Sequence, residues 1–257
     1  LVHLGDSYVA LANYGPKESN VQAEHLTSAI DRIKKALQLN LRVFVYRDFA
    51  YVVLGNAHED LAWLAQVGSD EEISKNYDQA IAAFKKVAEK NVPLGNMNLG
   101  RCYYKREVEG HQKGYLADAK AALEIAIARR KDYPEAYRWL GAVYEAEGNY
   151  DLAAEHFDKA VRFAKEQGSY NHGLYECYWA RAILETKKQP ASIRAEILNR
   201  LNDVDAQDEK VHKDLLLAVG KTYENEGKWQ EAIKQYSTAI GDSPKLIDAD
   251  LLRRRAG

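Results

Sequence analysis

A short apolar pattern recurs along the chain and constrains its fold more than any other feature. It consists of Leu or Val, then Gly, and an aromatic residue three positions after the Gly. The copies are Leu4-Gly5…Tyr8, Leu99-Gly100…Tyr103, Leu140-Gly141…Tyr144 and Val219-Gly220…Tyr223, and a fifth, Leu54-Gly55…His58, lacks the aromatic. Self-similarity of this kind predicts a solenoid in which each unit is a helical hairpin that buries its apolar face against its neighbours.

The copy around Gly141 shows how such a hairpin would pack. Its apolar residues follow the spacing of one face of an α-helix, and Ala153, Phe157 and Ala160 repeat that spacing after the turn. Small residues on both helices of the hairpin allow the two helix axes to approach closely. Gly148 suits the positive backbone angle of the turn, and Asn149 suits the N-cap of the second helix.

These residues resemble the tetratricopeptide repeat. The match is strongest from Pro134 to Gly168, and a second good copy runs from Leu216 to Pro244. The resemblance implies an all-α fold, a right-handed superhelical solenoid of antiparallel helix pairs. The copies lie about 40 residues apart, against about 34 in the standard repeat, and we expect part of the surplus in a loop from Lys105 to Gly114.

We therefore expect a single solenoid of about six helical hairpins over residues 1–257. The expected hairpins are 1–40, 41–92, 93–132, 133–168, a divergent one at 169–208, and 209–244, followed by a capping helix at 245–257. The chain begins inside a repeat motif, so we also expect it to be a fragment of a longer protein.

The net charge and the length of the apolar runs indicate which kinds of partner to exclude. The formal net charge is -2 and there is no basic cluster of the size that nucleic acid attracts, so we expect no nucleic-acid partner. No apolar run approaches the length of a membrane span, so we expect no membrane insertion and a cytoplasmic location.

Residue patterns that would indicate catalysis are missing from the sequence. It has no HExxH motif, no Gly-rich phosphate loop, no zinc-type cysteine spacing and no nucleophile elbow. Cys102 is expected to be a buried packing residue, and His58 takes the place of an aromatic on a core stripe. We expect a protein that is not an enzyme and that has neither a cofactor nor a metal site.

The resemblance also implies where a ligand would bind. In tetratricopeptide proteins the first helices of the hairpins line the concave groove, and residues beside the packing stripe face the ligand. Carried over by position, the groove residues are Asn56, Asn98, Arg101, Tyr104, Arg138, Trp139, Glu145 and Lys221, with Glu59 on the same face. Amides would hold a peptide backbone, and Arg101 and Arg138 would hold an acidic residue.

Two functions follow as hypotheses. The first is a protein-protein interaction scaffold that binds a peptide or protein segment, with an acidic residue, in the concave groove. The second is a structural module that positions a neighbouring domain or self-associates through its end repeats. The chaperone-tail clamp of the family needs two lysines, two asparagines and an arginine, and only Asn56 and Asn98 are in place.

Overall fold

The described part of the chain is helical throughout its regular structure. A computed structural model describes residues 6, 9, 19–38, 44–65, 69–90, 92–186, 188–203 and 209–240, and within these ranges it contains no strand. The helices are α2 (Ser19–Gln38), α3 (Phe44–Leu64), α4 (Asp70–Ala88), α5 (Pro93–Val108), α6 (Leu116–Arg129), α7 (Pro134–Ala146), α8 (Tyr150–Glu166), α9 (His172–Leu184), α10 (Pro190–Asp203), α11 (Glu209–Asn225) and α12 (Trp229–Ile240).

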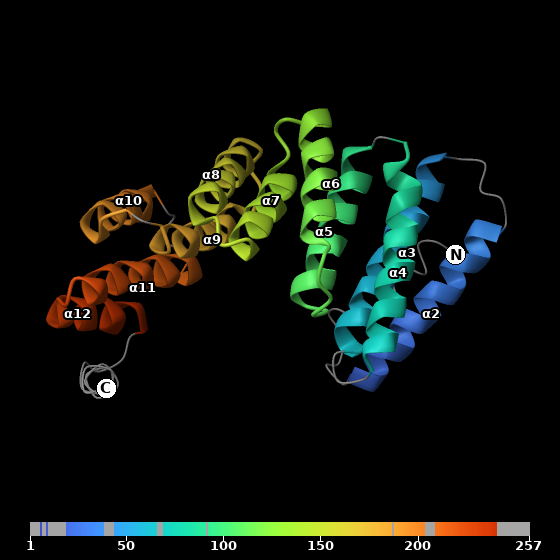
Figure 1. Ribbon diagram of the computed structural model, residues 1–257, viewed down its shortest axis with the longest axis horizontal. Coiled ribbons are helices and arrows are strands. Elements are labelled where there is room, and N and C mark those ends of the chain that lie inside the picture. Colours follow the sequence, from blue (N-terminus) through green and yellow to red (C-terminus); the bar gives the residue numbers. More distant parts are fainter. Residues whose placement is uncertain are drawn as a thin grey trace. The chain divides into compact units, whose positions relative to one another are not determined.

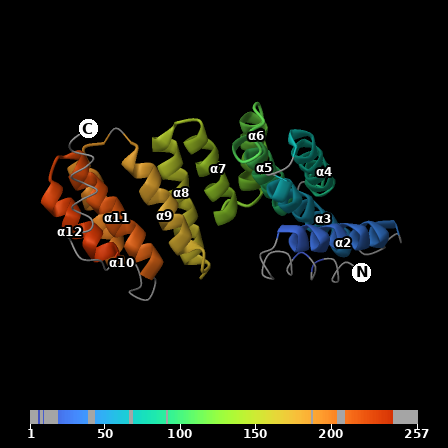
Figure 2. The same ribbon diagram turned by 90° about the horizontal axis from the view of Figure 1, so that it is seen from below.

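The chain divides into two compact units, which are described separately. Unit 1 comprises residues 1–143 and unit 2 residues 144–257, so the boundary falls within α7. In unit 1, α2 packs on α3, α3 on α4, α4 on α5 and α5 on α6 (Figure 1). In unit 2, α8 packs on α9, α10 on α11 and α11 on α12 (Figure 2).

Helices two apart in the chain also touch. In unit 1 α3 contacts α5, and in unit 2 α9 contacts α11, so the first helices of successive pairs are neighbours. Short connections between packed helices make each pair antiparallel. This arrangement confirms the predicted all-α solenoid of helix pairs. The predicted hairpin boundaries stay a prediction, and the predicted capping helix at 245–257 lies outside the described residues.

Local sequence accounts for where several helices begin. Gly148 has a φ of 74°, which glycine adopts at little cost, and the Asn149 side chain accepts a hydrogen bond from the Leu152 N–H at 3.4 Å. The predicted turn and N-cap are therefore confirmed. Gly227, with a φ of 73°, occupies the equivalent place before α12. Ser69 caps α4 by accepting from the Glu72 N–H at 3.3 Å.

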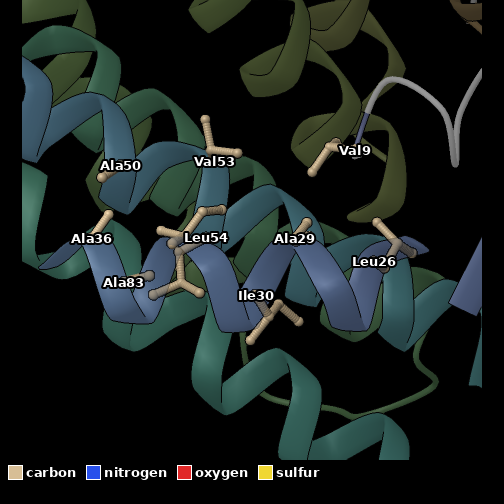
Figure 3. Close-up of a cluster of buried hydrophobic side chains, with 11 residues drawn as sticks. Val9, Leu26, Ala29, Ile30, Ala36, Ala50, Val53, Leu54 and Ala83 are labelled. Carbon is tan, nitrogen blue, oxygen red and sulfur yellow. The ribbon is translucent and has the colours of Figure 1, made fainter. Parts of the chain in front are cut away.

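The core of the first helices of unit 1 consists of small and branched side chains. Ala29, Ile33 and Ala36 of α2 are each no more than 2% exposed, and they pack with residues of α3 and α4. Figure 3 shows Leu54 and Ala83 beside Ala36 in this cluster. Alanines at the contact let the helix axes approach, while leucine and isoleucine fill the remaining space.

The prediction of a loop from Lys105 to Gly114 is wrong in its first half. Helix α5 continues to Val108, and only the segment from Glu109 to Tyr115 is non-helical. The extra turn is held by Arg106, whose side chain is buried although it is charged. It donates to Asp78 at 2.6 Å, to Ser74 at 3.1 Å and to Gln112 at 2.7 Å, and it lies over the Tyr115 ring.

The residue after Arg106 caps the following helix from a distance. The Glu107 carboxylate accepts hydrogen bonds from the backbone N–H groups of Tyr115 at 2.5 Å and Leu116 at 2.8 Å, where α6 begins. Tyr115, the N-cap residue of α6, makes no side-chain capping bond of its own. Glu107 therefore satisfies donors that the helix itself leaves open.

We predict that Glu107→Ala lowers the free energy of unfolding by about 1–3 kcal/mol, because two backbone donors lose a charged acceptor. Urea denaturation followed by circular dichroism measures this loss. Glu124→Ala is the matched control, since Glu124 is exposed on α6 itself and its removal should change stability by no more than about 0.5 kcal/mol. Equal effects of the two substitutions would contradict a capping role for Glu107.

No helix in the described ranges is both long enough and apolar enough to cross a membrane.

Candidate functional site

A charged network joins the first helices α3 and α5 of unit 1. Its centre is Glu59 of α3, which is only 2% exposed. Arg101 lies with Nε 3.2 Å from Glu59 Oε1 and donates through Nη2 to Oε2 at 3.2 Å, and Lys105 Nζ lies 2.9 Å from Oε1. A buried carboxylate needs cations beside it, since an unpaired charge there would be costly, and Arg101 and Lys105 meet this need for Glu59.

The pKa values of this network follow from its burial and its charges. Burial by itself would raise the pKa of Glu59, but the charges of Arg101 and Lys105 outweigh it and hold that pKa below its ordinary value. Burial would lower the pKa of Lys105, but Glu59 and then Glu109 reverse this and leave it raised. The pKa of Glu109 is raised, chiefly by burial.

The two predicted asparagines occupy different surroundings. Asn56 is half-buried, and its Oδ1 accepts from Arg101 Nη2 at 2.7 Å. Asn98 is 3% exposed, and its Nδ2 meets no acceptor in the described part of the chain. Asn56 therefore helps to orient Arg101 at the surface, whereas Asn98 belongs to the interior of the α5 packing face.

An aromatic and cationic cluster continues this face onto α7. The rings of Tyr104 and Trp139 lie 5.6 Å apart between centroids with planes tilted by 57°. The Arg138 guanidinium carbon lies 3.5 Å from the centroid of the Trp139 ring, which is a cation–π geometry. All three side chains are half-buried. We call Tyr104, Arg138 and Trp139 the aromatic cluster.

The remaining predicted residues, Glu145 and Lys221, lie in unit 2, where each pairs with a neighbour. Glu145 accepts from Arg181 of α9 through both carboxylate oxygens, at 2.7 and 2.5 Å. Lys221 forms an ion pair with Glu224 at 3.0 Å, one turn along α11, and is exposed. Of the predicted residues in unit 1, Asn56 thus contacts Arg101, and Tyr104 and Arg138 contact Trp139.

Lys105 and Glu109 are parts of the network that the sequence analysis did not select. Their spacing of four residues from Arg101 onward places all three on one face of α5, which is the signal that would have found them. His58 is buried, as its position on a core stripe predicted, and its Nδ1 lies 3.2 Å from Asn76 Oδ1. Burial lowers the pKa of His58. Cys102 is also buried, as predicted.

Comparison with known families identifies the repeat. A family model described as tetratricopeptide repeat matches residues 112–169, which include α6, α7 and α8. Residues 112–169 belong to the tetratricopeptide repeat family. The matched segment contains the Gly141 pattern and the Gly148-Asn149 turn on which the resemblance was based.

Solved structures extend the likeness of fold over more of the chain. Tetratricopeptide-like repeats of a kinesin light chain from Podospora anserina align with a TM-score of 0.54 and 16% identity, covering 72% of this chain and 92% of that one. A chain of the APC/C hetero-tetramer Cut9-Hcn1 aligns with a TM-score of 0.54 and 15% identity, covering 98% of this chain and 45% of that one. PilF of Pseudomonas aeruginosa aligns with a TM-score of 0.50 and 16% identity, covering 96% of this chain and 98% of that one.

Likenesses at such low identity concern the fold alone. A search of the curated proteins gave no match.

Proposed function

We propose that this chain is a protein-protein interaction scaffold and that the first-helix face of unit 1 binds a segment of another protein. The aromatic cluster carries the proposal. Trp, Tyr and Arg are the residue types that most often dominate binding energy at interfaces. Here the three types meet, half-exposed, on neighbouring helices of a tetratricopeptide-like solenoid.

The charges beside the cluster indicate what the segment would carry. Arg101, Lys105 and Arg138 are the cations of this face, and Glu59 and Glu109 are its carboxylates. Glu59 is buried beneath Arg101 and Lys105, while both of these cations keep about a fifth of their side-chain surface exposed. A segment with one acidic residue, lying over Arg101 and stacking an apolar side chain on Trp139, would match this surface.

The test is affinity capture from a native lysate with the wild-type chain and with Trp139→Ala. Truncating a hot-spot residue costs about 2 kcal/mol or more, which is roughly a thirtyfold loss of affinity. We therefore expect a partner that the wild type retains to be lost from Trp139→Ala, with the affinity of the identified partner then measured by calorimetry. Arg138→Ala should also lower the affinity for this partner.

Trp63→Ala provides the matched control. Trp63 is 54% exposed near the end of α3 and lies outside the aromatic cluster, so its removal should leave capture unchanged. Both variants should keep the wild-type melting temperature within a few degrees. Retention of the same partner by Trp139→Ala would refute binding at this face.

The chain is expected to bind rather than catalyse, in line with its family. Self-association through the end repeats would involve residues before 19 and after 240, most of which lie outside the described part of the chain. A mass that rises with concentration in light scattering would support it.

A further inference from the structure

A cavity opens between the first helices of unit 2. Its volume is about 490 Å³, within the range of about 300–1,000 Å³ that is usual for ligand pockets. Helix α9 contributes six lining residues and helix α11 contributes three. The lining includes Leu174, Cys177, Arg181 and Leu184 of α9 and Asp214 of α11.

Two apolar stripes on α9 explain how a helix can both join the core and line a cavity. Tyr175, Trp179 and Ile183 are buried, each no more than 3% exposed, and form the stripe that packs inward. Leu174, with 40% of its surface exposed, begins a second stripe that continues to Leu184 at steps of three and four residues. An apolar stripe left open to solvent is typical of a binding surface.

The charge at this cavity is set by one carboxylate. Arg181 lines the cavity, but its guanidinium is neutralised by the two-oxygen contact with Glu145. Asp214 of α11 also lines the cavity, is half-buried, and forms no ion pair within the described residues. Asp214 is therefore the carboxylate of this cavity that no cation within the described residues pairs.

We propose that this cavity, which we call the α9–α11 pocket, binds a protein segment that inserts a leucine-sized aliphatic side chain and places a Lys or Arg against Asp214. This deepens the proposed scaffold function and rests on it. The aliphatic side chain provides the affinity by filling the apolar cavity. The cation provides orientation and selectivity, since the uncompensated carboxylate repels acidic segments.

The probe is a short fluorescein-labelled peptide with two adjacent leucines between lysines, and the readout is fluorescence anisotropy. Replacing the leucines with alanine should weaken binding roughly tenfold or more, because apolar burial is lost. Replacing the lysines with glutamate should weaken it at least as much. Asp214→Asn should weaken binding of the lysine peptide by about two- to fivefold. Glu231→Gln removes an equal charge at an exposed position of α12 and should leave the affinity unchanged.

Cys177 supplies an independent readout inside the pocket. It lines the cavity and is half-buried, whereas Cys102 is fully buried and burial raises the pKa of its thiol. Iodoacetamide should therefore alkylate Cys177 in preference to Cys102, as mass spectrometry of digested protein would show. The lysine–leucine peptide should slow the alkylation of Cys177 several-fold, and the alanine peptide should not.

Three results would each overturn the proposal: no difference between the leucine and alanine peptides, equal binding of the lysine and glutamate peptides, or no protection of Cys177. Folding of Asp214→Asn is checked by its melting temperature, and the alkylation readout on the wild type needs no variant. Failure here is distinguishable from failure of the unit 1 site, because Trp139→Ala should bind this peptide as the wild type does.

Discussion

Replacing Glu59 with glutamine is expected to lower the free energy of unfolding by about 3 kcal/mol, since it leaves Arg101 and Lys105 without their shared carboxylate. Both cations keep part of their surface in water, which holds the cost at the low end of the range for broken buried ion pairs. Urea denaturation monitored by circular dichroism would measure it.

Glu89→Gln is the matched control. It also removes one carboxylate of an ion pair, but Glu89 and Lys86 are 63% and 55% exposed and their atoms lie 3.5 Å apart. Exposed pairs of this kind contribute no more than about 1 kcal/mol. If the two substitutions had equal effects, the buried position of Glu59 would not matter to stability.

The cost of Glu59→Gln should also depend on pH. Because the folded-state pKa of Glu59 lies below its ordinary value of 4.5, the stabilisation from its charge is complete above pH 4.5 and is lost as the pH falls through the folded-state pKa. The stability difference between wild type and variant should therefore be constant near neutral pH and shrink in acid. Lys105, whose pKa is raised, should lose its contribution only in strong alkali.

The second large effect is expected at Gly55, on the packing stripe of α3. In an exposed helix, Gly→Ala would stabilise by about 1 kcal/mol. A Cβ at Gly55, however, would lie 2.6 Å from Phe84 Cζ and 2.8 Å from Cδ1, on a ring that is fully buried. We therefore expect Gly55→Ala to destabilise by about 1–3 kcal/mol, a reversal of sign relative to the helix propensity.

A second variant identifies the clash as the cause. All three of the nearest atoms to that Cβ belong to the Phe84 side chain, so Phe84→Leu should cost less stability in the Gly55→Ala background than alone. Gly100 offers the contrast. A Cβ at Gly100 would lie 2.5 Å from Leu123 Cγ and 2.9 Å from the backbone oxygen of Ala119. Because the backbone oxygen would remain, Leu123→Ala should not fully restore the stability that Gly100→Ala loses. Additive effects at Gly55 and Phe84 would contradict this account.

The glycines of the repeated motif show why part of the fold could be predicted from the sequence. Gly55, Gly100 and Gly220 all lie where a side chain of the next helix leaves no room for a Cβ, so the recurrence of Gly in one motif reflects one repeated contact. The Gly148-Asn149 turn was readable because its backbone angle and its cap depend on those residues alone. The segment expected to hold a divergent hairpin also contains two helices, α9 and α10.

The end of α5 was predicted wrongly because it depends on contacts with other segments of the chain. Lys105, Arg106 and Glu107 are charged, so the segment up to Val108 has no apolar periodicity that indicates a helix. The extra turn depends instead on the contacts of Arg106 with α4 and with Gln112. Such tertiary contacts override the local helix propensity, and the neighbouring sequence does not indicate them.

The sequence by itself determined the repeat and the all-α arrangement of helix pairs, because both follow from the spacing of residues along single helices. Only the tertiary structure decided which charges meet: Glu59 with Arg101, 42 residues away, and Glu145 with Arg181, 36 residues away. The α9–α11 pocket likewise appeared only in three dimensions. Pairings and cavities depend on distances between helices, and the spacing of residues along one helix does not set those distances.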